Sequence, residues 1–167
     1  GRGLAPAPAY PPARAVFDPA DAAPPHDQPL LPQLCAEGPL EALTLTANTQ
    51  PAILAASLAC LAALRARLPS LRPSVVAGHS LGEYSALVAA GALPLGDAAR
   101  LLRLRGTAMQ EAVAPGEGAM SAVLMLDDAA VAALCAEVCA AMPGRVVSPA
   151  NFNAPNQVVV AGHADAV

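Results

Sequence analysis

The pattern of apolar and polar positions becomes regular from Thr49 onward. Residues 52–68 are rich in alanine and leucine and predict a helix, with Pro51 at a position suited to a first helical turn. Further helices are predicted over 83–90, ended by Gly91, and over about 97–113, with Asp97 in the first turn. A short apolar run at 75–78 predicts a strand between them. This order is typical of an α/β layer with a parallel sheet.

The pattern changes after Gly118. Residues 119–126 alternate like a strand, and Asp127 and Asp128 open a helix that runs to residue 141. Two more strands are predicted at 145–148 and 157–161, joined by a polar loop over 151–156, and residues 163–167 resemble the first turn of another helix. The order β-α-β-β-α fits a small ferredoxin-like α+β unit. We therefore expect a larger α/β domain at 1–117 and a smaller one at 118–167.

The first forty residues hold most of the prolines and give the least regular pattern. A short helix over 13–23, interrupted by Pro19, and a loop over 24–32 are predicted there. The segment lacks the charged start and apolar core of a signal peptide. The apolar run at 52–64 is too short to span a bilayer. We expect a cytoplasmic protein with no membrane partner.

Charge and cysteine content narrow the function classes. The net charge is −4, all nine basic residues are arginine, and they form no basic patch, which argues against a nucleic-acid partner. The four cysteines lack the spacing of a metal site, so no metal is expected. We interpret Cys35, Cys60, Cys135 and Cys139 as structural thiols in a reducing compartment.

The segment Gly78-His79-Ser80-Leu81-Gly82 has the pattern of a nucleophile elbow. A serine on a tight strand-to-helix turn stands at the positive end of the following helix. There the N–H of Leu81 can donate to an oxyanion that forms on an attacked carbonyl. The alternative is a glycine-rich turn with an incidental serine.

Arg105 is the second informative residue, because its neighbours on the predicted helix are apolar. A buried guanidinium needs an anion or several acceptors, and a substrate carboxylate could provide a two-pronged partner. The alternative is a structural ion pair, for which Glu83, Glu111 and Glu117 are candidates. Arg103, by contrast, is expected on an ordinary solvated face.

An activated serine also needs a base within hydrogen-bond reach. His79 adjoins Ser80, but its ring is expected to point away from the hydroxyl. His26 lies in the proline-rich segment, and His163 is expected to be a surface residue at a strand end. The sequence therefore offers no convincing base.

Residues 78–87, GHSLGEYSAL, resemble the active-site segment of the malonyl-CoA:acyl-carrier-protein transacylases, which are discrete bacterial enzymes of fatty acid synthesis. Similar segments follow the family's order over nearly the whole chain, at 46–52, 104–106, 109–113 and 151–162. Only the proline-rich segment around 19–32 departs noticeably. The resemblance implies an α/β-hydrolase-like acyltransferase core with a parallel sheet, together with a ferredoxin-like subdomain, both incomplete here.

The resemblance also implies an activity and roles for individual residues. Malonyl would pass from coenzyme A to the phosphopantetheine thiol of acyl carrier protein through an ester on Ser80, without a cofactor. Leu81 would donate to the oxyanion, and Arg105 would grip the malonyl carboxylate. The resemblance further assigns to the site Gln50, Gln157 and His79.

Two elements of that family are not found in this sequence. A Gly-Gln-Gly-Ser-Gln segment would lie before Gly1, and the catalytic histidine would lie beyond Val167. We therefore expect an internal fragment that is inactive alone, from an enzyme that is monomeric when complete. Three alternatives stay open: an acyltransferase domain of a modular polyketide synthase, a serine esterase of the α/β-hydrolase type, and a non-catalytic truncated product.

Overall fold

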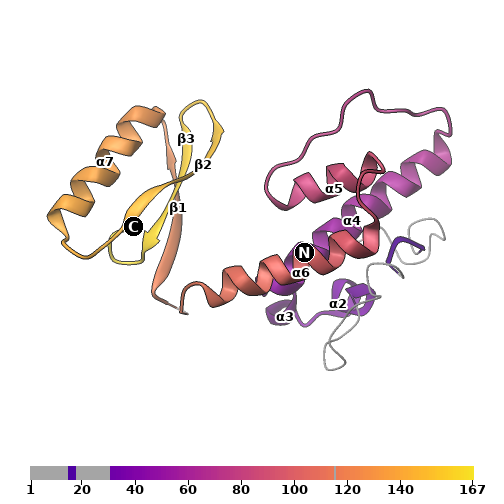
Figure 1. Ribbon diagram of the computed structural model, residues 1–167, viewed down its shortest axis with the longest axis horizontal. Coiled ribbons are helices and arrows are strands. Elements are labelled where there is room, and N and C mark those ends of the chain that lie inside the picture. Colours follow the sequence, from indigo (N-terminus) through magenta and orange to yellow (C-terminus); the bar gives the residue numbers. More distant parts are fainter. Residues whose placement is uncertain (1–14, 18–30, 115) are drawn as a thin grey trace. The chain divides into compact units, whose positions relative to one another are not determined.

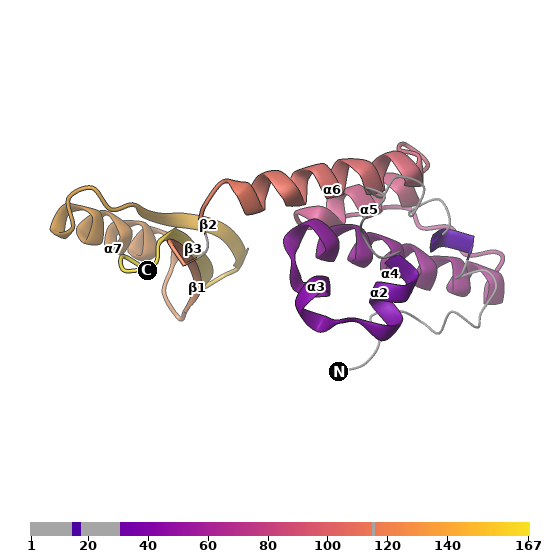
Figure 2. The same ribbon diagram turned by 90° about the horizontal axis from the view of Figure 1, so that it is seen from below.

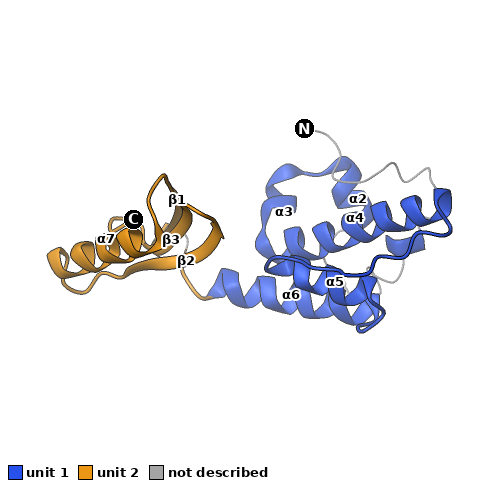
Figure 3. Ribbon diagram, turned by 90° about the horizontal axis from the view of Figure 1, so that it is seen from above, with its two compact units in different colours: residues 1–111 blue, residues 112–167 orange. Residues whose placement is uncertain are grey.

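The computed structural model describes residues 15–17, 31–114 and 116–167 (Figure 1). The chain forms two compact units, residues 1–111 and 112–167 (Figure 3). The sequence pattern instead places the boundary at the start of the sheet, at Gly118. The predicted helix over 13–23 and loop over 24–32 lie mostly outside the described residues; residues 15–17 are helical, and residues 31 and 32 belong to a helix rather than to the loop.

The first unit is helical in its described part. Its helices are α2 (Leu31–Glu37), α3 (Leu40–Thr44), α4 (Thr46–Arg67), α5 (Leu81–Ala89) and α6 (Leu95–Glu111). The long helix α4 packs against the other four (Figures 1 and 2). Its buried alanines and leucines share one core with Leu31 and Leu34 of α2 and Leu102 of α6. This packing brings α4, α5 and α6 together around the predicted site.

Helix α4 begins earlier than its apolar pattern predicts. The N–H groups of Asn48 and Thr49 both donate to the carbonyl of Leu45 at 2.8 Å, which starts the helix before the alanine-rich run. Pro51 therefore lies inside the helix and not in its first turn, where the missing N–H would have no consequence. The prediction was wrong because four of the five residues 46–50 are polar and continue no apolar pattern, whereas buried contacts of Asn48 and Gln50 hold them in the helix.

By length and composition, α4 is also the one described helix that could cross a membrane. Half of its most apolar stretch is buried within the first unit. The helix additionally carries the buried polar side chains Asn48 and Gln50. A buried core helix meets the same criteria of length and composition.

The predicted strand over 75–78 is absent. Residues 72–79 are exposed and carry no strand, and Val75 is 82% exposed. A strand forms only where a neighbour accepts and donates its backbone hydrogen bonds, and the described residues offer none beside this segment. The described residues form one sheet, which lies in the second unit and is antiparallel. The parallel sheet predicted for the larger domain is therefore not found among the described residues.

The second unit is a three-stranded sheet covered by one helix (Figure 3). Its elements are β1 (Gly118–Leu124), α7 (Asp128–Ala141), β2 (Val147–Ala154) and β3 (Gln157–His163). Strand β3 lies between β1 and β2 and is antiparallel to both, which is the order of a split βαβ unit. After β3 the chain makes a turn in which the N–H of Val167 donates to the carbonyl of His163.

Helix α7 begins as the sequence predicts. The Asp127 side chain accepts a hydrogen bond from the N–H of Ala130 at 2.7 Å, which caps the first turn. The helix buries Val131 and Cys135 against valines of β2 and β3. Burial, together with nearby Cys139, raises the pKa of the Cys135 thiol, which favours a neutral packing role.

The predicted polar loop over 151–156 is mostly strand. β2 continues to Ala154, and the turn to β3 consists of Pro155 and Asn156, the latter with φ of 60°. Asn151 and Phe152 pair with Val159 and Val158 of β3, so the register of the hairpin overrides their weak strand propensity. β2 is an edge strand of this sheet, which explains why it tolerates Pro149.

Candidate active site

Ser80 lies on a sharp turn immediately before α5. Its backbone angles φ and ψ are 55° and −115°, a conformation that residues other than glycine rarely adopt. A Cβ on Gly78 would lie 1.9 Å from the carbonyl oxygen of Gly82, so only glycine fits there. A Cβ on Gly82 would meet nothing within 4 Å, and this glycine contributes the closely approached backbone instead. The elbow is therefore present even without a preceding strand.

The turn places the first N–H groups of α5 beside Ser80. The N–H of Gly82 donates to the carbonyl of His79 at 2.9 Å, and that of Glu83 donates to the carbonyl of Ser80 at 3.1 Å. The N–H of Leu81 has no hydrogen-bond partner among the described residues. It is one of the free donors that every helix N-terminus leaves, at the positive end of the helix dipole.

Helices α4 and α6 approach closely at Gly106. A Cβ at this position would lie 2.5 Å from the Thr46 carbonyl oxygen and 2.6 Å from the Cα of Ala47. The absence of a side chain lets the two backbones come together. As a result, side chains on either side of the crossing can reach from one helix to the other.

Arg105 connects the two helices with Ser80. Its Nη1 donates to Oε1 of Gln50 at 2.6 Å, and its Nη2 donates to Oγ of Ser80 at 2.8 Å. Gln50 is 4% exposed, and its Nε2 donates in turn to Sδ of Met109 at 3.4 Å. Three of the predicted site residues therefore form one hydrogen-bonded group.

The surroundings of Arg105 differ from the sequence prediction in two ways. Of its helical neighbours, Leu102 is buried, but Leu101 and Met109 are 44% and 49% exposed, so the apolar face around Arg105 is only partly buried. No carboxylate among the described residues forms an ion pair with it, so the predicted pairing with Glu83, Glu111 or Glu117 is not seen. Neutral partners hold the cation.

The prediction for Arg103 was wrong, because this residue is half-buried against α4 and not on a solvated face. Its Nη1 donates to Oδ1 of Asn48 at 3.0 Å. Asn48 is 6% exposed, and its Nδ2 donates to the carbonyl of Ala42 at 2.9 Å. Sequence reasoning missed this pair, because neither residue stands out before its partner is known.

The remaining predicted residues are not brought into this group. His79 is exposed, and its carbonyl serves the turn. Gln157 begins β3 in the second unit, and its place in the site remains a prediction. His163 ends the same strand, and its Nδ1 accepts the N–H of Val146 at 2.9 Å, which indicates a structural role.

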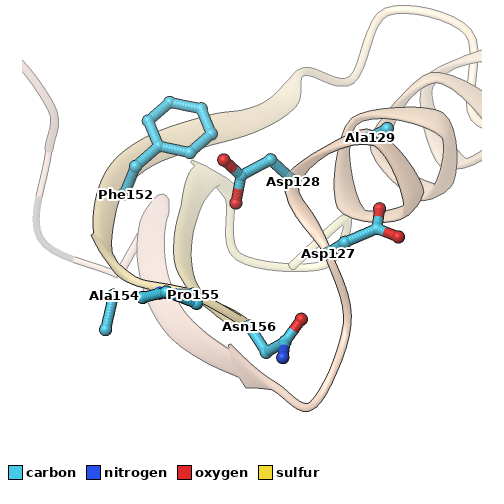
Figure 4. Close-up of a pocket in the computed structure, with 7 residues that line it drawn as sticks. All are labelled: Asp127, Asp128, Ala129, Phe152, Ala154, Pro155 and Asn156. Atoms are coloured by element: carbon cyan, nitrogen blue, oxygen red, sulfur yellow. The ribbon is translucent and has the colours of Figure 1, made fainter.

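An open pocket of about 650 Å³ lies in the second unit (Figure 4). Figure 4 shows the side chains of Phe152, Asp128 and Asn156 among those that line it. Its lining contains none of the residues predicted for the site. Asp127, which also lines it, already caps α7.

Three chemical groups of the first unit lie close together. They are the hydroxyl of Ser80, whose backbone is strained, the N–H of Leu81 and the guanidinium of Arg105. The hydroxyl is a nucleophile for a carbonyl carbon, and the Leu81 N–H is suited to a developing oxyanion. The Arg105 guanidinium is suited to a carboxylate, because its nitrogens form a fork. A family model described as "Acyl transferase domain" matches residues 12–167.

The chain belongs to the acyl transferase domain family. It is 50% identical over 158 residues to the malonyl CoA-acyl carrier protein transacylase of Escherichia coli K12, an alignment that covers 95% of this chain and 49% of that protein. The crystal structure of the acyl-carrier-protein S-malonyltransferase from Burkholderia pseudomallei 1710b is similar, with a TM-score of 0.83 and 45% identity, covering 99% of this chain and 54% of that one.

A further similar structure is a type II PKS acyl-carrier protein in complex with its malonyl-transacylase. Its TM-score is 0.82 at 41% identity, and the match covers 99% of this chain and 54% of that one. The chain thus spans about half the length of the relatives that it matches. These findings confirm the resemblance drawn from the sequence, and they favour an acyltransferase family over the esterase alternative.

Proposed function

We propose that the protein transfers a malonyl group from malonyl-CoA to the phosphopantetheine thiol of acyl carrier protein in fatty acid synthesis. The observation that carries the proposal is the hydrogen bond of 2.8 Å between the Arg105 guanidinium and the Ser80 hydroxyl. A cation directly beside the nucleophile suits an acyl group whose free carboxylate lies only a short chain away from the reacting carbonyl. Malonyl is such a group.

The reaction would run in two halves through a covalent ester. The Ser80 oxygen attacks the thioester carbon while a base takes its proton, and the Leu81 N–H stabilises the oxyanion. Collapse of this intermediate breaks the carbon–sulfur bond, and coenzyme A leaves as the thiol after receiving a proton. The carrier thiol then attacks the malonyl-serine ester, which transfers the acyl group and returns the proton to the serine oxygen.

Arg105 would select the acyl group. A malonyl carboxylate takes the place of Ser80 Oγ on Nη2 and leaves the hydroxyl free to react, while Gln50 keeps Nη1. An acetyl group offers no such anion. The enzyme would therefore discriminate through the partner that the cation gains in the bound state.

The base that activates Ser80 is a separate requirement. The hydrogen-bond partner of its hydroxyl among the described residues is Arg105. A guanidinium donates hydrogen bonds but has no lone pair to take up a proton, so it cannot serve as the base. We infer that the base is a histidine from outside residues 1–167, since this chain spans only 49% of the length of its Escherichia coli relative. Residues 1–167 alone would then be weakly active or inactive.

The partners follow from the same chemistry. A malonyl-transacylase bound to its acyl-carrier protein among the similar structures supports a carrier protein as the acceptor. Because that carrier belongs to a type II PKS, malonyl delivery to a polyketide pathway is the second candidate. We further propose a cytoplasmic monomer with no metal, cofactor, nucleic-acid or membrane partner. We also propose that residues 75–78 pair as a strand of a hydrolase-like parallel sheet in the whole enzyme.

The test is a transfer assay with the full-length protein, malonyl-CoA and phosphopantetheinylated acyl carrier protein. Incubation with malonyl-CoA alone should give a protein mass increased by one malonyl group, and Ser80→Ala should abolish both this adduct and the transfer. Ser85→Ala, on the same helix, is the matched control. A malonyl adduct that persists in Ser80→Ala would overturn the proposal.

A further inference from the structure

Two hydrogen-bonded pairs connect α4 and α6, and only one of them touches Ser80. Gln50 with Arg105 is the pair at the nucleophile, because Arg105 also donates to the Ser80 hydroxyl, whereas Asn48 with Arg103 is a second pair between the same two helices. Both pairs join an amide oxygen to an arginine Nη1, across the same sequence separation of 55 residues. The second pair therefore repeats the first, two residues earlier on each helix.

The two arginines leave α6 on opposite sides of its contact with α4. The buried residues of α6 are Ala98, Ala99, Leu102 and Gly106. Each residue turns the helix by about 100°. Arg103 therefore lies about 100° to one side of Leu102, and Arg105 lies about 100° to the opposite side of Gly106. The guanidinium groups therefore flank the buried residues on both sides.

This arrangement opposes rotation of α6 about its own axis. Gly106 has no side chain to interlock with α4, so at this point of the crossing no side chain opposes the rotation, and the two arginine pairs add their resistance to that of the shared apolar core. A roll that shortened one of the two pairs would stretch the other. With Arg103 fixed, Arg105 keeps its position relative to both Gln50 and Ser80.

The acceptor of the outer pair is itself held in place. Asn48 is 6% exposed, and its Nδ2 donates to the Ala42 carbonyl at 2.9 Å, which directs Oδ1 toward Arg103. Loss of the arginine head would leave this buried oxygen without that donor. The pair is thus anchored to the backbone before α4.

We propose that Arg103 is a positioning residue for the dicarboxylic acyl group: through Asn48 it fixes the roll of α6 and thereby the place of Arg105 beside Ser80. This inference rests on the proposed malonyl transfer. Arg103 acts through Arg105 and touches no substrate. Its loss should weaken the recognition of a carboxylate more than it weakens acyl transfer in general.

The test compares Arg103→Met with Arg100→Met in the full-length protein. Arg103→Met keeps an apolar stem and removes the donor, whereas Arg100 is exposed on the same helix and pairs with Asp97. We expect Arg103→Met to lower kcat/KM for malonyl-CoA about tenfold while acetyl-CoA changes little, because small displacements of a binding group are costly. Arg103→Lys, which keeps a cationic donor, should restore most of the preference, and Arg100→Met should behave like the wild type.

Crystal structures of the same variants give a readout that does not depend on activity. In Arg103→Met, the Arg105 contact with Ser80 or with Gln50 should be lost, and in Arg100→Met both should remain. Arg103→Gln, whose amide ends short of Asn48, replaces Arg103→Met if that variant does not fold. Unchanged Arg105 contacts, or an equal fall in kcat/KM for the two thioesters, would overturn the inference. A wild-type protein without malonyl transfer would instead overturn the proposed function, and the structures would still test the role of Arg103.

Discussion

The Arg105 guanidinium donates a hydrogen bond to the Ser80 hydroxyl at 2.8 Å, although the two residues are 25 positions apart. One residue lies in α6 and the other on the turn before α5, and each is held by its own contacts. The sharp turn, in which the backbone of Gly78 closely approaches that of Gly82, holds Ser80 at a positive φ. A hydrogen bond to Gln50 holds the Arg105 guanidinium. A nucleophile and a cation are thus placed together before any substrate arrives, which reduces the cost of orienting one.

Arg105→Ala should change the choice of acyl group and not merely reduce the rate. Hydrogen bonds to charged groups contribute about 1.5–3 kcal/mol each, so loss of a two-pronged contact should lower kcat/KM for malonyl-CoA by about a hundredfold or more. Transfer from acetyl-CoA should improve relative to malonyl-CoA, because no unpaired cation then penalises it. Steady-state kinetics with both thioesters measure the ratio. An unchanged ratio would make Arg105 merely structural.

Gly78→Ala should disrupt the elbow, whereas Gly82→Ala should leave it intact. A Cβ at position 78 collides with the backbone of Gly82 at 1.9 Å, but one at position 82 meets nothing within 4 Å. Forced overpacking costs about 1–3 kcal/mol, and a backbone collision belongs at the upper end of that range. Thermal unfolding and malonyl-adduct formation check both variants. Equal effects of the two substitutions would contradict the geometry of the turn.

Residues 1–167 alone should transfer malonyl poorly beside the full-length protein. The segment contains Ser80 and Arg105, but loss of a general base costs about two to four powers of ten. The measurement is malonyl transfer to the carrier protein, with folding of both proteins checked by circular dichroism. Turnover within about tenfold of the full-length protein would mean that this segment supplies its own base.

The stability of the second unit should fall at alkaline pH through Cys135. Burial raises the pKa of this thiol above its ordinary value of 9.0, so the folded state retains a proton that the unfolded state releases. The contribution is therefore fully present below about pH 9 and is lost as the pH rises above it. Thermal unfolding at about pH 8 and pH 10 should show a smaller loss for Cys135→Ala than for the wild type. Cys60→Ala, at an exposed position, is the control and should follow the wild type.

Local sequence patterns predicted much of the fold but failed where pairing is long-range. The helix after Asp127 and the helix ending before Gly91 were predicted closely, because capping and glycine conformations depend on adjacent residues. The extent of β2 was not, because its pairing with β3 keeps residues 151–154 extended against their own propensity. The strand at 75–78 was predicted from apolar character alone, without a neighbouring strand to form its hydrogen bonds.

The sequence by itself determined the elbow, since the close approach of Gly78 to Gly82 and the positive φ of Ser80 between them all fall within five consecutive residues. It also singled out Arg105 as an arginine in need of a partner. Only the tertiary structure decided that the partners are Gln50 and Ser80 and that Arg103 pairs with the buried Asn48. These contacts depend on the close crossing of α4 and α6 at Gly106. Such a crossing arises from packing between segments that are distant in the sequence. The apolar pattern of one helix does not specify which other helix will pack against it, or at which residue the two will cross.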